Sequence, residues 1–198
     1  MKYYLLLLAI SVTLVSSAQN NFPYSVALKD SNGKTVDSKT FTNNGKPVVI
    51  DFWASWCIPC IVKYNSMRSV YKKWQEETGV RIITISLDNK PEAMTKAKEL
   101  ATKNGWPFEL YFDEEKKLLS QLTSEEAIPH SFFYDKDLKL VGDKIGASIT
   151  KKGGSNDDGS FKDAMSNKDS KLDGFECNLD EYYKLLKKIA AGSVSAGK

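Results

Sequence analysis

Two cysteines separated by two residues, Cys57 and Cys60, are the side chains of this sequence best suited to chemistry. Paired thiols at this spacing can exchange with a disulfide, and zinc sites use the same spacing. A zinc site needs four ligands, and the chain offers only one further cysteine, Cys177, and one histidine, His130. Three cysteines also leave at least one thiol outside an intramolecular disulfide. The close pair is therefore predicted to be a redox unit, with a Cys₃His zinc site as the alternative.

The residues around the pair predict a strand followed by a helix. Val48 to Trp53 is apolar except for one acid, which fits a strand buried on both faces of a helix-covered sheet. From Pro59 onward, apolar side chains recur at steps of three and four residues, which indicates an amphipathic helix that ends near Gly79. The lysines between them, Lys63 included, are expected on the polar face of this helix.

This junction gives the two thiols different roles. Cys57 lies at the predicted helix N-terminus, where free backbone N–H groups and the helix dipole stabilise a thiolate. Only the thiolate is nucleophilic, so this placement raises the reactivity of Cys57 near neutral pH. Cys60 lies one turn into the helix and is the natural resolving thiol. Pro59 is tolerated there because the first turn contains N–H groups without intrahelical partners.

Asp51 interrupts the apolar strand six residues before Cys57. A carboxylate in a dry strand is costly, and burial favours its protonated form. Such an acid beneath the pair could accept and return the proton of Cys60 during exchange. The alternative is a structural acid that hydrogen-bonds the backbone or pairs with a lysine.

The rest of the chain alternates strands with helices, which predicts an α/β fold with a central mixed sheet flanked by helices. Strands are expected at 80–87, 108–112, 131–134 and 139–142, helices at 91–105, 114–122 and 179–190, and a hairpin at 22–36 in front. Segment 150–174 is polar and nearly without apolar anchors, so it is expected to be a solvated loop inserted before the last helix. A calcium loop at 169–180 is rejected because Lys171 stands where an oxygen ligand is needed.

The segment Val49 to Cys60, VIDFWASWCIPC, resembles the active-site segment of thioredoxins. Lys29 to Lys34 before it and Ile128-Pro129 after it also match. With its leading hairpin and apolar N-terminus, the chain is most similar to the exported TlpA/ResA-like branch, whose members are often reductants for cytochrome c maturation or similar targets. The resemblance covers roughly 22–146 and the closing helix, and it implies a thioredoxin fold with an N-terminal hairpin extension.

By this resemblance, Cys57 is the attacking thiol, Cys60 resolves, and Pro129 is a cis proline that faces the pair. The Ile128 main chain would hold the substrate as an added strand. Other residues expected to border the substrate are Trp56, Ile58, Pro59 and His130. Trp53 is expected to be part of the core.

The sequence departs from the thioredoxin pattern at several places. Ser55 and Ile58 differ within the motif, and His130 follows the proline where a threonine is more usual. His130 would either tune the Cys57 thiolate or simply be exposed, and both alternatives stay open. Cys177 is extra and is expected to behave as an inert, small hydrophobic residue packed beside the last helix.

The N-terminus indicates export. A basic start, an apolar run of about 13 residues and a small-x-small site at 16–18 are typical of a secretory signal, with an uncleaved anchor as the alternative. We expect a signal peptide at 1–18, a thioredoxin-like domain at 19–198, and a periplasmic or otherwise extracytoplasmic location. The net charge of +3 comes from scattered residues, so no nucleic-acid partner is expected.

These observations predict an enzyme that reduces substrate disulfides through Cys57 and Cys60 with help from Asp51. Its substrates would be disulfide-containing exported proteins, and an exported or membrane thiol system would supply electrons; no cofactor or metal is expected. The reverse direction, a disulfide donor or isomerase, is an alternative. A copper metallochaperone using the pair and His130 is another. A peroxidase is disfavoured because no Pro-x-x-x-Thr-x-x-Cys motif is present.

Overall fold

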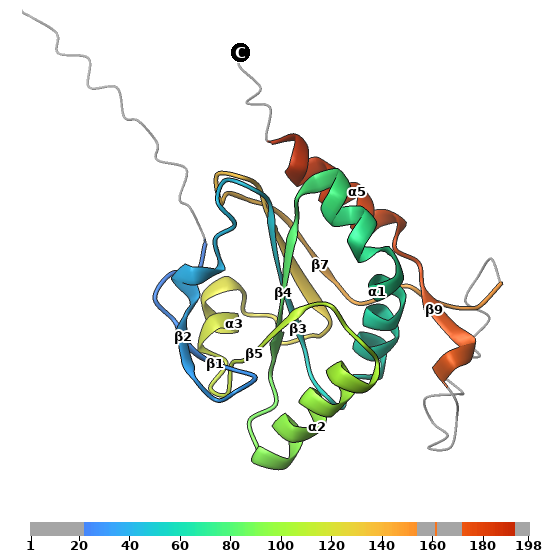
Figure 1. Ribbon diagram of the computed structural model, residues 1–198, viewed down its shortest axis with the longest axis horizontal. Coiled ribbons are helices and arrows are strands. Elements are labelled where there is room, and N and C mark those ends of the chain that lie inside the picture. The colour runs from blue at the N-terminus through green and yellow to red at the C-terminus, as the bar shows by residue number, and fades with distance from the viewer. Residues whose placement is uncertain (1–21, 154–160, 162–171, 193–198) are drawn as a thin grey trace, which may run out of the picture.

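A central sheet of seven strands organises the chain (Figure 1). The structure is a computed structural model and describes residues 22–153, 161 and 172–192. In spatial order the strands are β2 (Thr35–Asp37), β1 (Ala27–Asp30), β5 (Glu109–Phe112), β4 (Arg81–Ser86), β3 (Val48–Trp53), β6 (His130–Tyr134) and β7 (Leu140–Ile145). β3, β4 and β5 are parallel, and the other neighbours pair antiparallel. This confirms the predicted mixed sheet, and the hairpin β1–β2 confirms the N-terminal extension.

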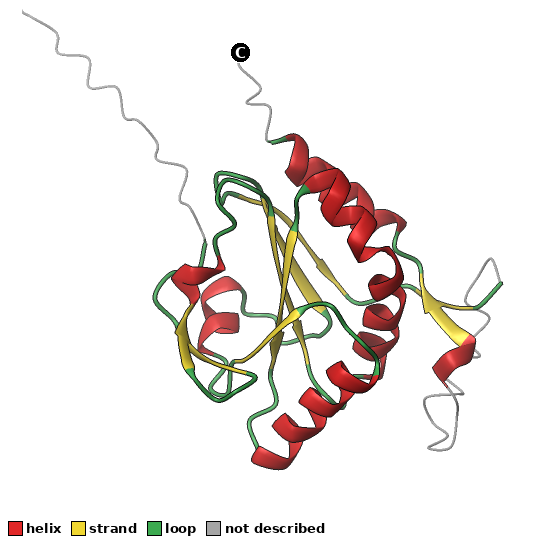
Figure 2. Cartoon of the chain, viewed as in Figure 1, coloured by secondary structure: helices red, strands yellow, loops and turns green. Residues whose placement is uncertain are grey.

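Helices cover both faces of the sheet (Figure 2). The helices are α1 (Ile58–Thr78), α2 (Pro91–Lys103), α3 (Lys117–Leu122) and α5 (Asp180–Ala191). Buried side chains of α1, α2 and α5 share one core cluster with β3, whereas α3 and the N-terminal segment pack on the opposite face. This layering is the thioredoxin fold that the sequence predicted.

The six residues of β3 are all buried because they serve both faces in turn. Val49 and Trp53 belong to the cluster beneath α1, while Ile50 and Phe52 belong to the cluster beneath α3. Side chains alternate along a strand, so Asp51 must point to the α1 face. The sheet thereby directs a carboxylate toward the helix that carries the cysteines.

Two helix ends follow local rules. α1 ends as predicted at Gly79, whose φ of 68° is a left-handed value that glycine adopts without strain. α3 begins at Lys117 and not at the predicted residue 114, because Asp113 accepts the backbone N–H groups of Leu118 and Leu119. Within the described residues, no helix combines the length and apolar character needed to cross a membrane. The predicted signal peptide lies outside the described residues.

The predicted polar insertion is anchored at its ends, contrary to the expectation of a wholly solvated loop. β8 (Ile149–Lys151) and β9 (Phe175–Cys177) form a second, two-stranded sheet beside α1. Phe161 is only 6% exposed, and its ring lies 5.3 Å from that of Phe175. An apolar cluster with Val62 of α1 forms around these residues. The sequence pattern missed it because isolated apolar residues in a polar segment show no periodicity.

Candidate active site

Cys57 and Cys60 form a disulfide at the start of α1, with an S–S distance of 2.02 Å. Cys57 caps the helix: its Sγ accepts the backbone N–H of Cys60 over 3.3 Å. The pair is almost inaccessible, since Cys57 is 4% exposed and Cys60 is fully buried. The helix N-terminus predicted to stabilise the thiolate is therefore in place.

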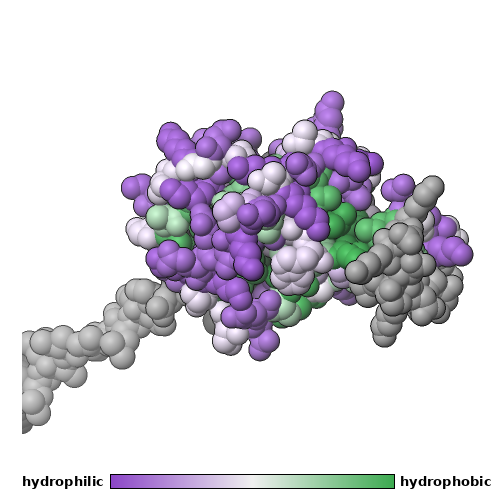
Figure 3. All heavy atoms as spheres, turned by 90° about the horizontal axis from the view of Figure 1, so that it is seen from below, coloured by the Kyte–Doolittle hydropathy of each residue, from purple (hydrophilic) through white to green (hydrophobic). Residues whose placement is uncertain are grey.

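The loop before Cys57 presents one tryptophan to solvent and buries another. Trp56 is 66% exposed, so it can contact a partner. Trp53 is fully buried and packs edge-on against Tyr64 and Trp106, which confirms its predicted place in the core. Figure 3 shows a face of the molecule that is mostly hydrophilic, with a smaller group of hydrophobic side chains on the right of the view.

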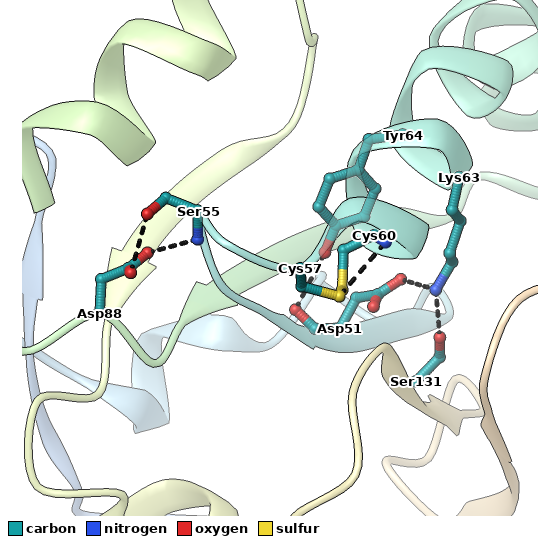
Figure 4. The surroundings of a disulfide bond; sticks show 8 residues. All are labelled: Asp51, Ser55, Cys57, Cys60, Lys63, Tyr64, Asp88 and Ser131. Carbon is teal, nitrogen blue, oxygen red and sulfur yellow. Dashed lines mark hydrogen bonds and ion pairs between the residues drawn. A yellow bond between two sulfur atoms is a disulfide. The ribbon is translucent and has the colours of Figure 1, made fainter. Parts of the chain in front are cut away.

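Ser55 and Asp88 hold this loop (Figure 4). Asp88, just after β4, is 3% exposed and accepts hydrogen bonds from the Ser55 backbone and hydroxyl. Asp88 was not among the site residues predicted from the sequence. A Ser-x-Asp pattern at 86–88, directly after a strand, was the available signal for a local hydrogen-bonded turn.

The Ile128–Pro129 peptide bond is cis, as the resemblance implied. β6 starts next to the end of β3, with His130 paired to Phe52, so Pro129 comes to the edge of the sheet where Cys57 follows β3. The backbone N–H of Gly146 donates to the Pro129 carbonyl over 2.8 Å and fixes the loop from the β7 side. Ile145, the last residue of β7, is 46% exposed there.

Asp51 is fully buried, and it is paired with a lysine. The Lys63 ammonium donates to Asp51 Oδ2 over 2.6 Å and to the Ser131 hydroxyl over 2.7 Å (Figure 4). The Tyr182 hydroxyl of α5 donates to the same Oδ2 over 3.3 Å. The alternative of a lysine partner is therefore realised, and Asp51 is not an isolated acid.

Lys63 does not lie where its helical position and charge predicted. It was expected on the polar face of the helix, yet it is only 2% exposed. It lies three residues after Cys60 and four before Met67, both fully buried, so the helical spacing did put it on the buried face. Its charge concealed this, because lysines are almost never buried unless they are paired.

His130 is neither exposed nor directed toward the disulfide. It is 1% exposed, and its Nε2 lies 2.8 Å from Asp143 Oδ2 on β7. Along β6 it shares the face of Phe132, on which its ring stacks, whereas Ser131 faces α1. The expectation of an exposed residue is wrong, and this orientation gives no support to tuning of Cys57.

Cys177 is free and buried, as predicted. Its backbone N–H donates to the Ser66 hydroxyl of α1 over 2.8 Å. Burial raises the pKa of the Cys177 thiol above its ordinary value of 9.0. Among the residues that the structure describes, no group of three or more histidine, cysteine or acidic side chains could hold a metal ion.

Known proteins with similar sequences are named for thiol–disulfide exchange, as the following matches show. The AhpC/TSA family model matches residues 19–142. Among curated proteins, the thiol-disulfide oxidoreductase ResA of Bacillus anthracis is 32% identical over 117 residues, covering 59% of this chain and 64% of ResA. The thiol:disulfide interchange protein DsbE of Haemophilus influenzae is 30% identical over 104 residues, covering 50% and 52%. The chain thus spans less than two thirds of the length of these relatives.

Solved structures support the thioredoxin-like fold. A thioredoxin-like protein of Porphyromonas gingivalis matches with a TM-score of 0.54 and 32% identity, covering 72% of this chain and 88% of that one. A secreted disulfide oxidoreductase of Mycobacterium tuberculosis matches with a TM-score of 0.58 over 86% of this chain and 99% of that one, and at 15% identity it speaks for the fold alone. The chain belongs to the AhpC/TSA family and is a thioredoxin-like protein.

Proposed function

We propose that this protein is an exported thiol–disulfide oxidoreductase that reduces disulfides of other exported proteins by dithiol–disulfide exchange. The observation that carries the proposal is the closed Cys57–Cys60 disulfide at the N-terminus of α1, beside the edge where cis Pro129 lies. The names of the curated relatives ResA and DsbE support the same reaction class.

The reaction begins with the reduced pair. The Cys57 thiolate, stabilised by the first turn of α1, attacks one sulfur of a substrate disulfide. A mixed disulfide forms, and the other substrate sulfur leaves as a thiolate. Cys60 then gives its proton to Asp51 and attacks Cys57 Sγ, which closes the Cys57–Cys60 disulfide and releases the second substrate sulfur. The protein dithiol is oxidised and the substrate disulfide is reduced.

The substrate would bind as an extended segment along the Ile128 main chain. Trp56 and Ile145, which are among the exposed large hydrophobic side chains of the described residues, support an apolar contact on either side of it. Ile58 and Pro59 of the motif would border the same segment. His130 would act only from behind the sheet, because its ring faces away from the pair.

An extracytoplasmic location is part of the proposal. The predicted signal peptide at 1–18 supports it. A reductant that works outside the cytoplasm must be reduced again there, so an exported or membrane thiol system would supply electrons.

The trapping experiment tests this function. Cys60→Ser removes the resolving thiol, so mixed disulfides with client proteins should accumulate on Cys57 and disappear on treatment with dithiothreitol. Cys57→Ser, which removes the attacking thiol, is the matched control and should trap nothing. If Cys60→Ser forms no adducts, the exchange mechanism is wrong.

The direction of exchange is tested by the reduction potential of the pair. A value near the about −270 mV of thioredoxin fits a reductant, and a value near the about −120 mV of strong periplasmic oxidants fits a disulfide donor. A peroxidase would need the Pro-x-x-x-Thr-x-x-Cys setting, but Ile50 and Ala54 stand at the corresponding positions before Cys57.

A further inference from the structure

The Asp51 carboxylate is held asymmetrically. Its two side-chain donors, the Lys63 ammonium and the Tyr182 hydroxyl, bind the same oxygen, Oδ2. The other oxygen, Oδ1, is buried and accepts no hydrogen bond from any residue that the structure describes. A buried carboxylate oxygen without a donor is costly, which points to a donor that is present in another redox state of the site.

We propose that Lys63 and Tyr182 are positioning residues: they hold Asp51 through Oδ2 so that Oδ1 stays free to take the proton of Cys60. The inference rests on the exchange reaction proposed above and adds the residues that control its second step. In the view of Figure 4, the Asp51 oxygen without a dashed line lies toward the sulfur atoms and the bonded one toward Lys63.

The redox state of the pair explains why Oδ1 lacks a partner. In the disulfide, Cys60 Sγ is bonded to Cys57 and carries no proton. After Cys57 has attacked a substrate, Cys60 is a thiol, and its proton passes to Oδ1 while its sulfur attacks Cys57 Sγ. The bond between Cys57 and the substrate breaks with its electron pair on the substrate sulfur, which afterwards takes up a proton.

The surroundings of Lys63 fit this task. Its side chain is 3% exposed and its ammonium lies 4.9 Å from the centre of the Tyr182 ring, besides its bonds to Asp51 and Ser131. An ammonium this deep is tolerated only with several partners. At 2.6 Å from Oδ2, the ammonium also fixes the direction in which the Asp51 carboxylate faces.

The other groups that face Asp51 keep their protons at neutral pH. Burial, and then the Asp51 charge, raise the pKa of Tyr182 and of Tyr64 well above 10. Both phenols therefore remain donors, with Tyr64 directed at the Asp51 carbonyl over 3.4 Å. Two further groups lie nearby. Ser131 of β6 contacts Lys63. The thiol of Cys177 on β9, whose pKa is raised by burial, interacts electrostatically with Lys63 and Asp51.

The test is the pH dependence of a single turnover. Fully reduced protein is mixed with insulin, and closure of the Cys57–Cys60 disulfide is followed through its tryptophan fluorescence. The rate of the wild type should fall toward acid pH for two reasons, protonation of the Cys57 thiolate and protonation of Asp51, and Asp51→Asn should slow closure and remove the second contribution. Lys63→Met should move the Asp51-dependent part of the profile toward higher pH, and Tyr182→Phe should move it by less in the same direction. Lys73→Met, an exposed lysine of the same helix, should superimpose on the wild type.

The outcomes separate the two proposals. If the reduced wild type does not react, the proposed function fails. If it reacts and Asp51→Asn removes the Asp51-dependent part of the pH profile, but Lys63→Met and Tyr182→Phe leave that part unchanged, this inference fails alone. Should Lys63→Met not fold, Tyr182→Phe decides by the same criterion. The neutral double variant Asp51→Asn/Lys63→Met should fold and match Asp51→Asn, and a further loss of rate in it would give Lys63 a role independent of Asp51.

Discussion

The backbone N–H of Ser55 donates to Asp88 Oδ2 over 2.7 Å, and the Ser55 hydroxyl donates to Asp88 Oδ1 over 3.0 Å. The Ser86 hydroxyl also donates to this carboxylate, over 2.7 Å. One buried acid thereby ties the loop that precedes Cys57 to the end of β4. The attacking cysteine is positioned from two sides, by the helix that begins after it and by the loop that leads to it.

Replacement of Asp88 should weaken both the fold and the site. Asp88→Ala removes three hydrogen bonds to a buried charge, and we expect it to lower the free energy of unfolding by about 2–4 kcal/mol. Urea denaturation of the oxidised protein measures this. Asp137→Ala is the control, because Asp137 is 69% exposed and forms a surface ion pair with Lys136; its effect should stay within about 0.5 kcal/mol. Equal effects of the two variants would contradict the role of Asp88.

Trp56→Ala should affect substrate binding without affecting stability. The side chain is 66% exposed, so its removal costs little folding free energy. An aromatic residue at the centre of an interface commonly contributes 1–2 kcal/mol or more, so kcat/KM for reduction of insulin should fall by about 5- to 30-fold. The rate with oxidised glutathione, which is too small to cover Trp56, should change much less. Tyr24→Ala, an exposed aromatic of the N-terminal segment, serves as the control. A uniform loss on both substrates would show that Trp56 acts on the cysteines themselves.

Cys177 should be unreactive in the folded protein. Burial raises its pKa, so little thiolate is present at mildly alkaline pH, and the side chain is also shielded from reagents. In the oxidised native protein we expect Ellman's reagent to label it at least about 100-fold more slowly than it labels the protein in denaturant. Cys177→Ala should remove this signal. Rapid labelling of one thiol in native, oxidised wild type would contradict the buried position.

Acidification should weaken the pair between Arg81 and Glu109, where two hydrogen bonds of 2.6 and 2.7 Å connect β4 to β5. Burial alone raises the pKa of Glu109, but the Arg81 guanidinium and the Tyr111 hydroxyl lower it by more, so it lies below its ordinary value of 4.5. Since the folded-state pKa is the lower one, the contribution to stability is complete above pH 4.5 and is lost as the pH falls through the folded value.

The expected magnitude is below about 1 kcal/mol, because both side chains are partly exposed. Glu109→Gln should therefore cost stability at neutral pH and little at strongly acid pH, as measured by urea denaturation at the two values. Glu115→Gln, which changes a 71% exposed acid, should show no such difference. A cost of Glu109→Gln that does not depend on pH would assign the contact to packing and not to charge.

Much of the fold was readable from local pattern. The alternation of apolar runs with residues at helical spacing located β3, α1, β4 and α5 in their order. The cysteine pair was placed correctly at the start of α1, because the continuous apolar run of the strand ends before Cys57 and apolar residues at helical spacing begin after it. These features depend on the chain within a few residues of each position, so the sequence contains them.

The chemistry around Asp51 depends on contacts between distant segments. Ser131 and Tyr182 lie 68 and 119 residues after Lys63, and only the packing of β6 and α5 against α1 brings them together. The side of the sheet to which His130 points was settled by the register of β6 with β3. The anchoring of Phe161 likewise arises from the second sheet.

The sequence by itself thus determined the α/β order of strands and helices, the redox pair and the acid beneath it, because each is set by spacing along a strand or a helix; the thioredoxin fold was implied by the resemblance of the cysteine motif. The tertiary structure decided that this acid has a buried lysine as its partner, that one of its oxygens is left without a donor, and that the histidine after the cis proline faces away. Those properties depend on which side chains come into contact when separate elements pack, and no pattern within one element specifies these contacts.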